Sequence, residues 1–303
     1  MTPINFDWCQ TVFYDINLVQ LIVADDMQVT NPRELLDIKR YPIDDTNSPT
    51  RRALVECCRH DLDDQAICAL EGFVKPEFVI RMAEESTILA ESGYKNENMR
   101  TPYGWMYNRD FPKDHPRAAM FLNSSSLVLT HQFPGNTLIE ELYHWDVLTE
   151  FAGEVLGLKT LYRCACPSLS IMISSLDKGN QVGWHFDTND GVVSLLLQSP
   201  DQGGEFECAP YIRSEENENY ETVSRLFSGE EEFALTPKIT PGTFVLFKGR
   251  RTCHRVTEVG ETTRPRLIAL FSYDEEPGMI FPEATVNDFM DPSPTPYYGK
   301  VAP

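Results

Sequence analysis

Apolar residues recur at helical spacing in the first half of the chain. The repeat covers residues 51–64, 75–92 and 136–157, where it places apolar side chains on one face of each segment. Pro76 is acceptable near the start of a helix, and Gly157 is typical of the residue that follows one. The first half of the chain is therefore predicted to contain three helices.

The segments between these helices show other patterns. The run ICALEGFV at 67–74 predicts a short strand. Residues 94–118 are rich in Asn, Pro, Tyr and Arg, which predicts an irregular segment that covers part of the fold. The sequence contains no internal repeat, so the change of periodicity along the chain is the main guide to its organisation.

After residue 157 the pattern changes to short runs of strand-forming residues separated by turn residues, such as Gly203-Gly204 and Pro241-Gly242. A series of short strands without intervening helices favours a sandwich or jelly roll over a parallel sheet. Eight strands are predicted, at LYRCAC, LSIMISS, VVSLLLQS, GEFECAP, FALTPKI, TFVLFKG, HRVTEV and RLIALFSYD.

These elements predict an α+β fold with a mainly β core, in the form of a jelly roll with flanking helices. We expect one catalytic domain over residues 1–303. Within it, residues 1–157 form a helix-rich flank, 158–279 form the jelly-roll core, and the proline-rich residues 280–303 form an extended tail.

Charge and composition narrow the possible partners. The chain has 26 basic and 46 acidic residues, a net charge of −20, and lacks a basic run that could follow phosphates, so nucleic acid and anionic membranes are poor partners. The acidic residues 215–232 are interpreted as a solvated face. The start lacks a signal-peptide pattern, and no apolar run approaches the roughly 18 residues of a membrane span, which predicts a cytoplasmic protein. The eight cysteines lack a CxxC pair and are expected to be free, buried thiols.

The residues GWHFD at 183–187 contain the first candidate chemistry. Two residues at positions i and i+2 of an extended backbone point to the same side, so His185 and Asp187 can reach one cation. A third ligand must come from elsewhere, and His254, 69 residues downstream at the start of another predicted strand, is the candidate. Taken alone, His185 and Asp187 are equally well explained as a hydrogen-bonded surface pair.

The same HxD spacing occurs at His144 and Asp146, where it is given less weight. These two residues lie within the predicted helix 136–157, and side chains two positions apart on a helix diverge. For the remaining histidines, 60, 115 and 131, no partner pattern is present.

Two histidines and one carboxylate are the ligand set of non-haem Fe(II) oxygenases, in which three coordination positions stay open. A 2-oxo acid cosubstrate takes two of these positions, and its far carboxylate needs a fixed cation such as a guanidinium. Arg264 and Arg266 follow His254 and are both candidates. If residues 254–259 and 266–273 form a hairpin, Arg266 lies inside the ladder and Arg264 nearer the turn, which favours Arg266.

Four other residues are candidates for contact with a substrate. Trp184, Asn189 and Asp190 surround the HxD motif, and Arg163 lies in a preceding predicted strand. Each has an ordinary structural explanation, because tryptophan is usually a core residue and an Asn-Asp pair usually forms a turn.

The segments GWHFD, VVSLLLQSPDQGGEFECAPYIRS, PGTFVLFKGRRTCHRVTEV and RPRLIALFSYDEEPG together resemble the Fe(II)/2-oxoglutarate-dependent dioxygenases. The likeness is to the branch that acts on amino acids and small specialised metabolites, including halogenases and kainoid-type cyclases. It is strongest over residues 155–279 and does not extend to the first 50 residues or the tail.

The resemblance implies a double-stranded β-helix core in which His185, Asp187 and His254 bind Fe(II), while an arginine of the RPRL segment binds 2-oxoglutarate. The other implied reactants are dioxygen and a small-molecule substrate, an amino acid or a derivative of one. Hydroxylation is the expected outcome, and cyclisation or desaturation would use the same site. Related halogenases have a small residue in place of the carboxylate ligand, so the presence of Asp187 argues against halogenation.

Two further classes of protein fit the same three ligands. A jelly-roll protein that binds a metal without redox turnover would not need a guanidinium inside the barrel. A zinc hydrolase would need a general base and would act without oxygen. The sequence does not indicate an oligomeric state.

Overall fold

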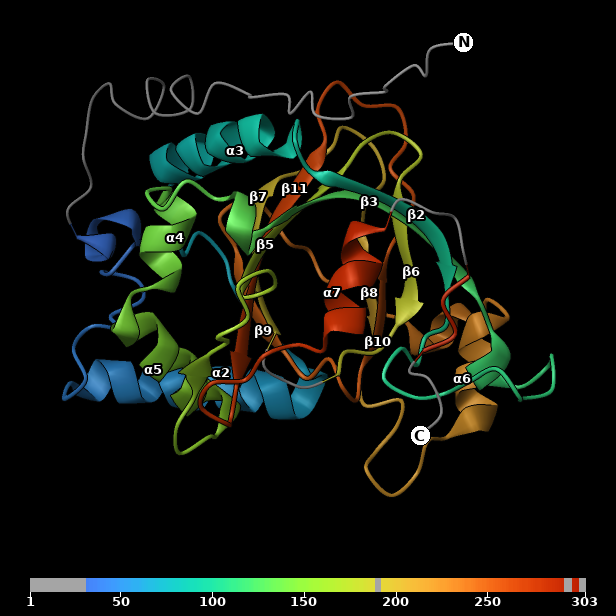
Figure 1. Ribbon diagram of the computed structural model, residues 1–303. Helices are drawn as coiled ribbons and strands as arrows, with labels where there is room; N and C mark the ends of the chain where they lie inside the picture. The colour runs from blue at the N-terminus through green and yellow to red at the C-terminus, as the bar shows by residue number, and fades with distance from the viewer. Residues whose placement is uncertain (1–30, 189–191, 292–295, 300–303) are drawn as a thin grey trace, which may run out of the picture.

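In the part of the chain that the structure describes, eleven strands form one antiparallel sheet that curls into a half-barrel with helices on its flanks (Figure 1). The structure is a computed structural model that describes residues 31–188, 192–291 and 296–299. The sheet order is β1-β9-β7-β11-β5-β3-β6-β10-β8, with β2 beside β3 and β4 beside β11. The predicted α+β fold with a jelly-roll core is confirmed.

The bounds of the elements are as follows. The strands are β1 (Ile67–Leu70), β2 (Tyr94–Arg100), β3 (Phe121–Leu129), β4 (Tyr162–Arg163), β5 (Ile171–Leu176), β6 (Gln181–His185), β7 (Val192–Gln198), β8 (Phe206–Ala209), β9 (Phe244–Phe247), β10 (Cys253–Val256) and β11 (Arg266–Asp274). The α-helices are α2 (Pro49–Gln65), α3 (Pro76–Ala90), α4 (Leu138–Tyr143), α5 (Asp146–Leu156), α6 (Tyr220–Phe227) and α7 (Glu283–Met290). Short 3₁₀ turns are η1 (Pro32–Leu35), η2 (Pro116–Ala118), η3 (Thr130–Gln132) and η4 (Glu231–Phe233).

Local signals in the sequence fix the starts of the flanking helices. Ser48 caps α2 by accepting a hydrogen bond from the backbone N–H of Arg51, and Pro49 occupies the first turn. At α4, Thr137 and Glu140 form a capping box in which each side chain accepts from the backbone of the other residue. These caps satisfy backbone donors that the first turn of a helix leaves unpaired.

The convex face of the sheet carries the main hydrophobic core. Helix α3 packs against β3, β5, β7 and β11, and α2, α4 and α5 extend the same apolar layer. The aromatic ring of Phe73 lies inside this layer. Its centroid is 4.7 Å from the ring centroid of Phe244 and 6.5 Å from that of Phe151. Phe73 therefore links a strand of the sheet to helix α5.

Helix α7 covers part of the opposite, concave face of the sheet. Val286, Phe289 and Met290 of α7 pack against a small cluster that includes Leu127 and Leu129 of β3. An ion pair of 2.7 Å between Arg100 of β2 and Asp288 of α7 holds the helix there. In Figure 1 α7 stands within the opening of the half-barrel.

Several predicted elements are corrected by the structure. The helix predicted over 136–157 is two helices, α4 and α5, because Trp145 is extended and its carbonyl accepts the first hydrogen bond of α5. The hydrophobic spacing continues through this break because each short helix buries its own apolar side chains. Residues 233–239 do not form a strand; Leu235 makes only an isolated bridge to Cys208.

Two polar strands were missed. Strand β2 lies within the segment predicted to be irregular, and β3 was not predicted. In β2 the buried positions are occupied by Asn96 and Asn98, and the alternate positions 95, 97 and 99 are exposed. The strand therefore alternates between buried and exposed residues, but its buried residues are polar. The run Asn123-Ser124-Ser125-Ser126 in β3 reads as a turn on composition alone.

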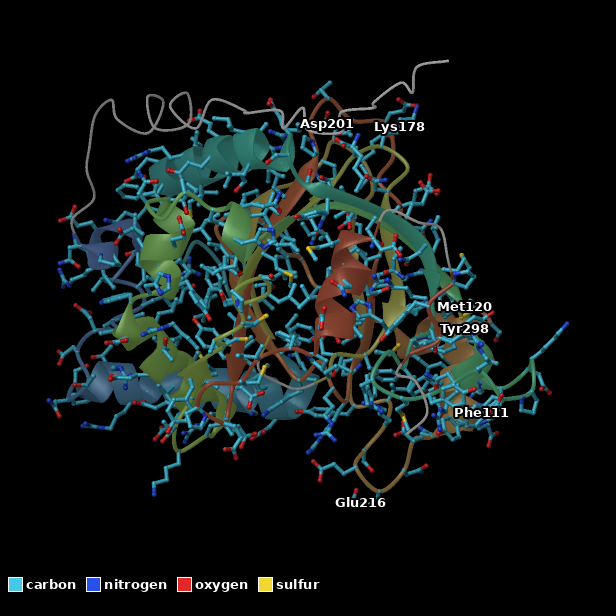
Figure 2. The ribbon with its side chains drawn as sticks, in the orientation of Figure 1. Phe111, Met120, Lys178, Asp201, Glu216 and Tyr298 are labelled. Carbon is cyan, nitrogen blue, oxygen red and sulfur yellow. The ribbon has the colours of Figure 1, made fainter. Side chains whose placement is uncertain are left out.

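Two helices were also missed. Helix α6 lies within the acidic segment and buries Val223 and Leu226, although residues 214–217 of the preceding loop are exposed, as predicted for a solvated face. Figure 2 shows Glu216 at the tip of this loop. Helix α7 lies in the tail that was predicted to be extended. Within the described part of the chain, no helix is long and apolar enough to cross a bilayer.

We expect Phe73→Ala to lower the free energy of unfolding by about 3–5 kcal/mol, because it removes a buried aromatic ring and leaves a cavity among packed side chains. Urea denaturation followed by circular dichroism measures this change. Ile80→Ala, on the exposed side of α3, is the control and should change stability by less than about 0.5 kcal/mol. Equal effects of the two substitutions would contradict the assigned core.

Candidate metal centre and cosubstrate pocket

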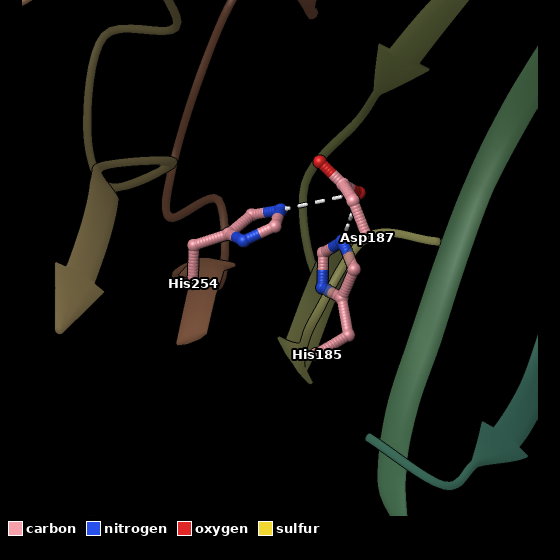
Figure 3. A group of neighbouring side chains, drawn as sticks. All are labelled: His185, Asp187 and His254. Carbon is pink, nitrogen blue, oxygen red and sulfur yellow. Dashed lines mark ion pairs between the residues drawn. The ribbon is translucent and has the colours of Figure 1, made fainter. Parts of the chain in front are cut away.

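His185, Asp187 and His254 converge at one place on the concave face (Figure 3). Strand β10 pairs with β6 so that His254 lies directly opposite His185, and the two imidazole centroids are 4.0 Å apart. Asp187 follows β6, and its Oδ1 lies 3.7 Å from Nε2 of His254 and 4.0 Å from Nε2 of His185. One ligand atom from each residue lies within 4.8 Å of the others. The predicted meeting of two distant segments is therefore present in the structure.

Backbone contacts orient both imidazoles towards this centre. Nδ1 of His185 lies 2.9 Å from the carbonyl oxygen of Gly183, and Nδ1 of His254 lies 3.0 Å from that of Thr252. A carbonyl oxygen can only accept, so each Nδ1 carries the proton and each Nε2 presents its lone pair towards the centre. Backbone carbonyls in this position are common partners of metal-binding histidines.

Burial keeps both imidazoles neutral. Desolvation lowers the pKa of His254 to about 4, and desolvation together with the neighbouring His254 lowers the pKa of His185 to about 4. A neutral imidazole is the form that binds a metal ion. The donor set, two neutral nitrogens and one carboxylate oxygen on one side of the centre, fits a ferrous ion with open coordination positions.

The backbone at Gly249 fixes the carboxylate of Asp187. The N–H of Asp187 donates to the carbonyl of Gly249 at 3.1 Å. A Cβ atom at position 249 would lie 2.1 Å from Oδ2 of Asp187, which is too close for any side chain. Gly249 therefore leaves the space that the carboxylate occupies, and sequence reasoning did not identify it.

Arg266 lies on the same face of the sheet as the two histidines. Residues paired across strands, or two apart along a strand, share a face, and a bulge between β6 and β10 brings Val182 and His185 onto one face. A series of such steps leads from Arg266 to His254, and all of its members therefore share one face. The series is Arg266, Ile268, Ser174, Leu127, Asn123, Val182, Val256 and His254. The concave face thus carries both the three-residue cluster and a guanidinium.

A pocket lies next to Arg266. Its lining includes Arg266, Leu196, Gly204 and Phe206. The ring of Phe206 lies 5.8 Å from the imidazole of His254, so one side chain borders both the pocket and the cluster. Gly204 packs against Arg266, where a Cβ atom would lie 3.2 Å from its Cδ.

The environment of Arg266 suits an anionic ligand. The side chain is buried, with 3% of its surface exposed, and desolvation lowers its pKa to about 10, while Glu205 favours the charged form. Among the described residues, the guanidinium makes no hydrogen bond or ion pair within 4 Å. Burying a charge in this way is costly, and an anion in the pocket would reduce the cost.

Arg264 has a different environment. Its side chain is 56% exposed, and its Nε lies 3.7 Å from a carboxylate oxygen of Asp201 in a surface loop. The hairpin that was used to choose between the two arginines is wrong, because β10 pairs with β6 and β8, whereas β11 pairs with β4, β5 and β7. Burial and the face of the sheet, not that hairpin, distinguish Arg266.

The other predicted contact residues lie elsewhere or outside the described residues. Trp184 packs with Phe186 and Leu226 on the side of β6 that faces α6, with the guanidinium carbon of Arg255 4.7 Å from its ring centroid. Arg163 donates hydrogen bonds to Thr149 and Asp146 of α5. Asn189 and Asp190 lie outside the described residues.

His144 and Asp146 do not join a metal-binding cluster. They flank the break between α4 and α5, so the helical geometry that was used to discount them is not the one observed. In the described part of the chain, His185, Asp187 and His254 form the group of three neighbouring His, Cys, Asp or Glu side chains that could hold a metal ion. The described cysteines are free, and all except Cys57 are buried.

Comparison with known proteins gives one family match and a set of similar solved structures. A family model described as halogenase D matches residues 50–280. No match is found among curated proteins. Similar solved structures include a 2OG-Fe(II) oxygenase family protein from Burkholderia pseudomallei, with 15% identity over 74% of this chain and 92% of that one at a TM-score of 0.47. They also include a prolyl-4-hydroxylase from Pseudomonas putida, with 13% identity over 72% of this chain and 98% of that one at a TM-score of 0.45.

A third similar structure is the α-ketoglutarate-dependent epimerase SnoN from nogalamycin biosynthesis, with 13% identity over 74% of this chain and 83% of that one at a TM-score of 0.48. The family match and the His-Asp-His cluster define the class as the Fe(II)/2-oxoglutarate-dependent oxygenases. The chain belongs to the halogenase D family within it.

We expect Gly249→Ala to weaken metal binding, because the new methyl group takes the space of the Asp187 carboxylate and forces it away from the imidazoles. Displacement of one ligand should lower the affinity for Co(II), measured by isothermal titration calorimetry, by at least about 10-fold. Gly104→Ala is the control, since a Cβ atom there meets only an ordinary contact of 3.5 Å. Unchanged Co(II) affinity in Gly249→Ala would show that the carboxylate does not need this space.

Proposed function

We propose that this protein hydroxylates an unactivated C–H bond of a small molecule, an amino acid or an amino-acid-derived metabolite. In this proposal His185, Asp187 and His254 are the three ligands of Fe(II), and Arg266 binds the far carboxylate of 2-oxoglutarate. The observation that carries it is the position of a buried guanidinium and a His-Asp-His cluster on one concave face, with Phe206 lining the pocket beside Arg266 and lying near the imidazole of His254.

The protein groups have separate tasks in this reaction. The two imidazoles and the carboxylate hold the metal from one side, and the carbonyls of Gly183 and Thr252 keep the imidazole lone pairs aimed at it. Arg266 supplies a buried, fixed cation, and a charge-assisted hydrogen bond from its guanidinium to a carboxylate is strong. Bound iron supplies the oxidising power by coupling the decarboxylation of 2-oxoglutarate to the reduction of dioxygen.

The atoms of the overall reaction balance without a further reductant. One oxygen atom of O₂ enters the substrate C–H bond and gives a hydroxyl group. The other enters the cosubstrate, which becomes succinate after losing carbon dioxide. The two electrons from the C–H bond and the two from the 2-oxo acid together reduce O₂, so the products are the hydroxylated substrate, succinate and CO₂.

The seating of Asp187 favours hydroxylation over halogenation, although the family is described by the latter. The resemblance to halogenases implies that they leave the carboxylate position to a halide. Here the carboxylate lies between Gly249 and the two imidazoles, so the corresponding place is filled.

The concave wall indicates a polar substrate of limited size. Asn98 and Asn123 pair across β2 and β3 on this face, and Ser174 and Ser194 lie on it farther along the sheet. Such amide and hydroxyl groups can hydrogen-bond an ammonium or carboxylate group. Helix α7 occupies part of the opening, which supports a small molecule rather than a folded partner.

One experiment separates this proposal from its rivals. Protein purified without oxygen and loaded with Fe(II) and 2-oxoglutarate should form succinate only after air is admitted, and faster with a true substrate. A zinc hydrolase would act without air, and a protein that only binds metal would give no succinate. Either result would contradict the proposal. A panel of amino acids and derivatives in the same assay would identify the substrate.

We expect Asp187→Ala to abolish hydroxylation while the fold stays intact, because the iron loses its only carboxylate ligand. Succinate formation coupled to substrate should fall at least about 10³-fold, and the far-ultraviolet circular dichroism spectrum should stay the same. His144→Ala is the matched control and should keep the iron content of the wild type. Normal turnover by Asp187→Ala would remove Asp187 from the proposed ligand set.

We expect Arg266→Ala to raise the KM for 2-oxoglutarate by at least about 10-fold, because it removes a buried charge-assisted contact worth roughly 1.5–3 kcal/mol. Arg264→Ala should change this KM less than about 2-fold, since the exposed Arg264 faces a surface carboxylate. Steady-state kinetics with varied 2-oxoglutarate measures both values. The reverse order would assign the cosubstrate to Arg264.

A further inference from the structure

The buried Arg213 contacts both chain segments that carry the proposed metal ligands. It lies between β8 and α6, and 5% of its side chain is exposed. Its guanidinium carbon lies 4.2 Å from the ring centroid of Phe186, the residue between His185 and Asp187. Its Nε donates to the carbonyl of Arg250 at 2.7 Å, and its Nη2 donates to the same oxygen.

The first contact fixes the segment of His185 and Asp187. Phe186 packs against Tyr103 and Trp105, with ring centroids 5.2 and 6.2 Å away, and the guanidinium of Arg213 covers its ring face. The N–H of Phe186 donates to the carbonyl of Pro102. Because the two ligands flank Phe186 in sequence, a fixed ring leaves their Cα atoms little freedom to move.

The second contact fixes the segment of His254. Arg250 follows Gly249, whose carbonyl accepts from Asp187 and whose missing side chain leaves room for the Asp187 carboxylate. Thr252, two residues later, holds Nδ1 of His254 through its carbonyl. The hydrogen bonds from Arg213 to Arg250 therefore act between these two ligand contacts.

Arg213 itself is held firmly. Its Nη1 donates to Glu218 at 2.8 Å, and the charge of Glu218 compensates that of the guanidinium. The ring centroid of Trp105 also lies close to Arg213, 4.5 Å from the guanidinium carbon. Arg is suited to this place because its planar guanidinium stacks on rings while its N–H groups donate in a fixed fork, whereas the Lys ammonium is a compact point charge without a planar face.

We propose that Arg213 is a positioning residue that sets the spacing of the three ligands by linking the Phe186 segment to the Arg250 segment. This inference rests on the proposed function, because it takes His185, Asp187 and His254 as metal ligands. Arg213 does not touch the cluster itself; it acts through Phe186 and Arg250. Contacts of this kind outside the ligand set typically change metal affinity about 10–100-fold when they are lost.

Co(II) binding to the metal-free full-length chain tests the inference. Isothermal titration calorimetry gives the affinity, and the visible absorption spectrum of bound Co(II) reports the ligand geometry. Arg213→Lys should lower the Co(II) affinity about 10–100-fold and alter the spectrum. Glu218→Gln keeps Arg213 but removes the charge that pairs with it. Because Glu218 is partly exposed, this variant should fold, and its Co(II) affinity and spectrum should change in the same direction as in Arg213→Lys by a smaller factor.

Arg51→Lys is the matched control. Arg51 is also buried, and it likewise donates to a backbone carbonyl, that of Ile43, and to a glutamate, Glu154. Its contacts lie among the flanking helices, so Arg51→Lys should reduce stability and leave the Co(II) affinity and spectrum unchanged. An equal loss of affinity in Arg51→Lys would overturn the inference, since the effect of Arg213→Lys would then reflect stability alone.

Two results distinguish failure of this inference from failure of the proposed function. If the wild type binds Co(II) and His254→Ala does not, the cluster is a metal site. In that case, a wild-type Co(II) affinity and spectrum in both Arg213→Lys and Glu218→Gln would overturn the role of Arg213. If His254→Ala binds Co(II) as the wild type does, the proposed ligand set is wrong, and the inference fails with it.

Discussion

The register between β6 and β10 is the constraint on which the candidate site depends. It places His254 opposite His185, although 69 residues separate them in the chain. A shift of one residue in this pairing would turn one imidazole to the other face of the sheet. The surrounding strands hold the register: β10 is also paired with β8, and β6 is also paired with β3. The cluster is therefore a product of the whole sheet rather than of the HxD motif.

The two faces of this sheet have different compositions for a physical reason. Apolar side chains cover the convex face, where α3 and its neighbours exclude water and supply most of the core. The concave face carries Asn98, Asn123, Ser174 and Arg266 among its apolar residues. The apolar side chains that form most of the core and these polar side chains thus occupy opposite faces of the same strands.

Sequence reasoning identified what a local pattern encodes. His185 and Asp187 share a side because they are two apart on an extended segment, and α2 and α3 follow from their apolar spacing. No local pattern predicts which strands pair with β10, because strand pairing is decided by packing over the entire sheet. Strands β2 and β3 were missed because their buried positions are polar, and Gly249 was missed because its role depends on contact with a distant carboxylate.

The contact between Gly249 and Asp187 has an evolutionary consequence. Since the wall beside the carboxylate is peptide backbone, loss of the Asp187 side chain would leave an open space without requiring a second residue to be trimmed. An aspartate codon becomes a glycine or alanine codon through one base change. In this scaffold, one base change at codon 187 would therefore open a place for an anion beside the imidazoles without rearrangement of the barrel.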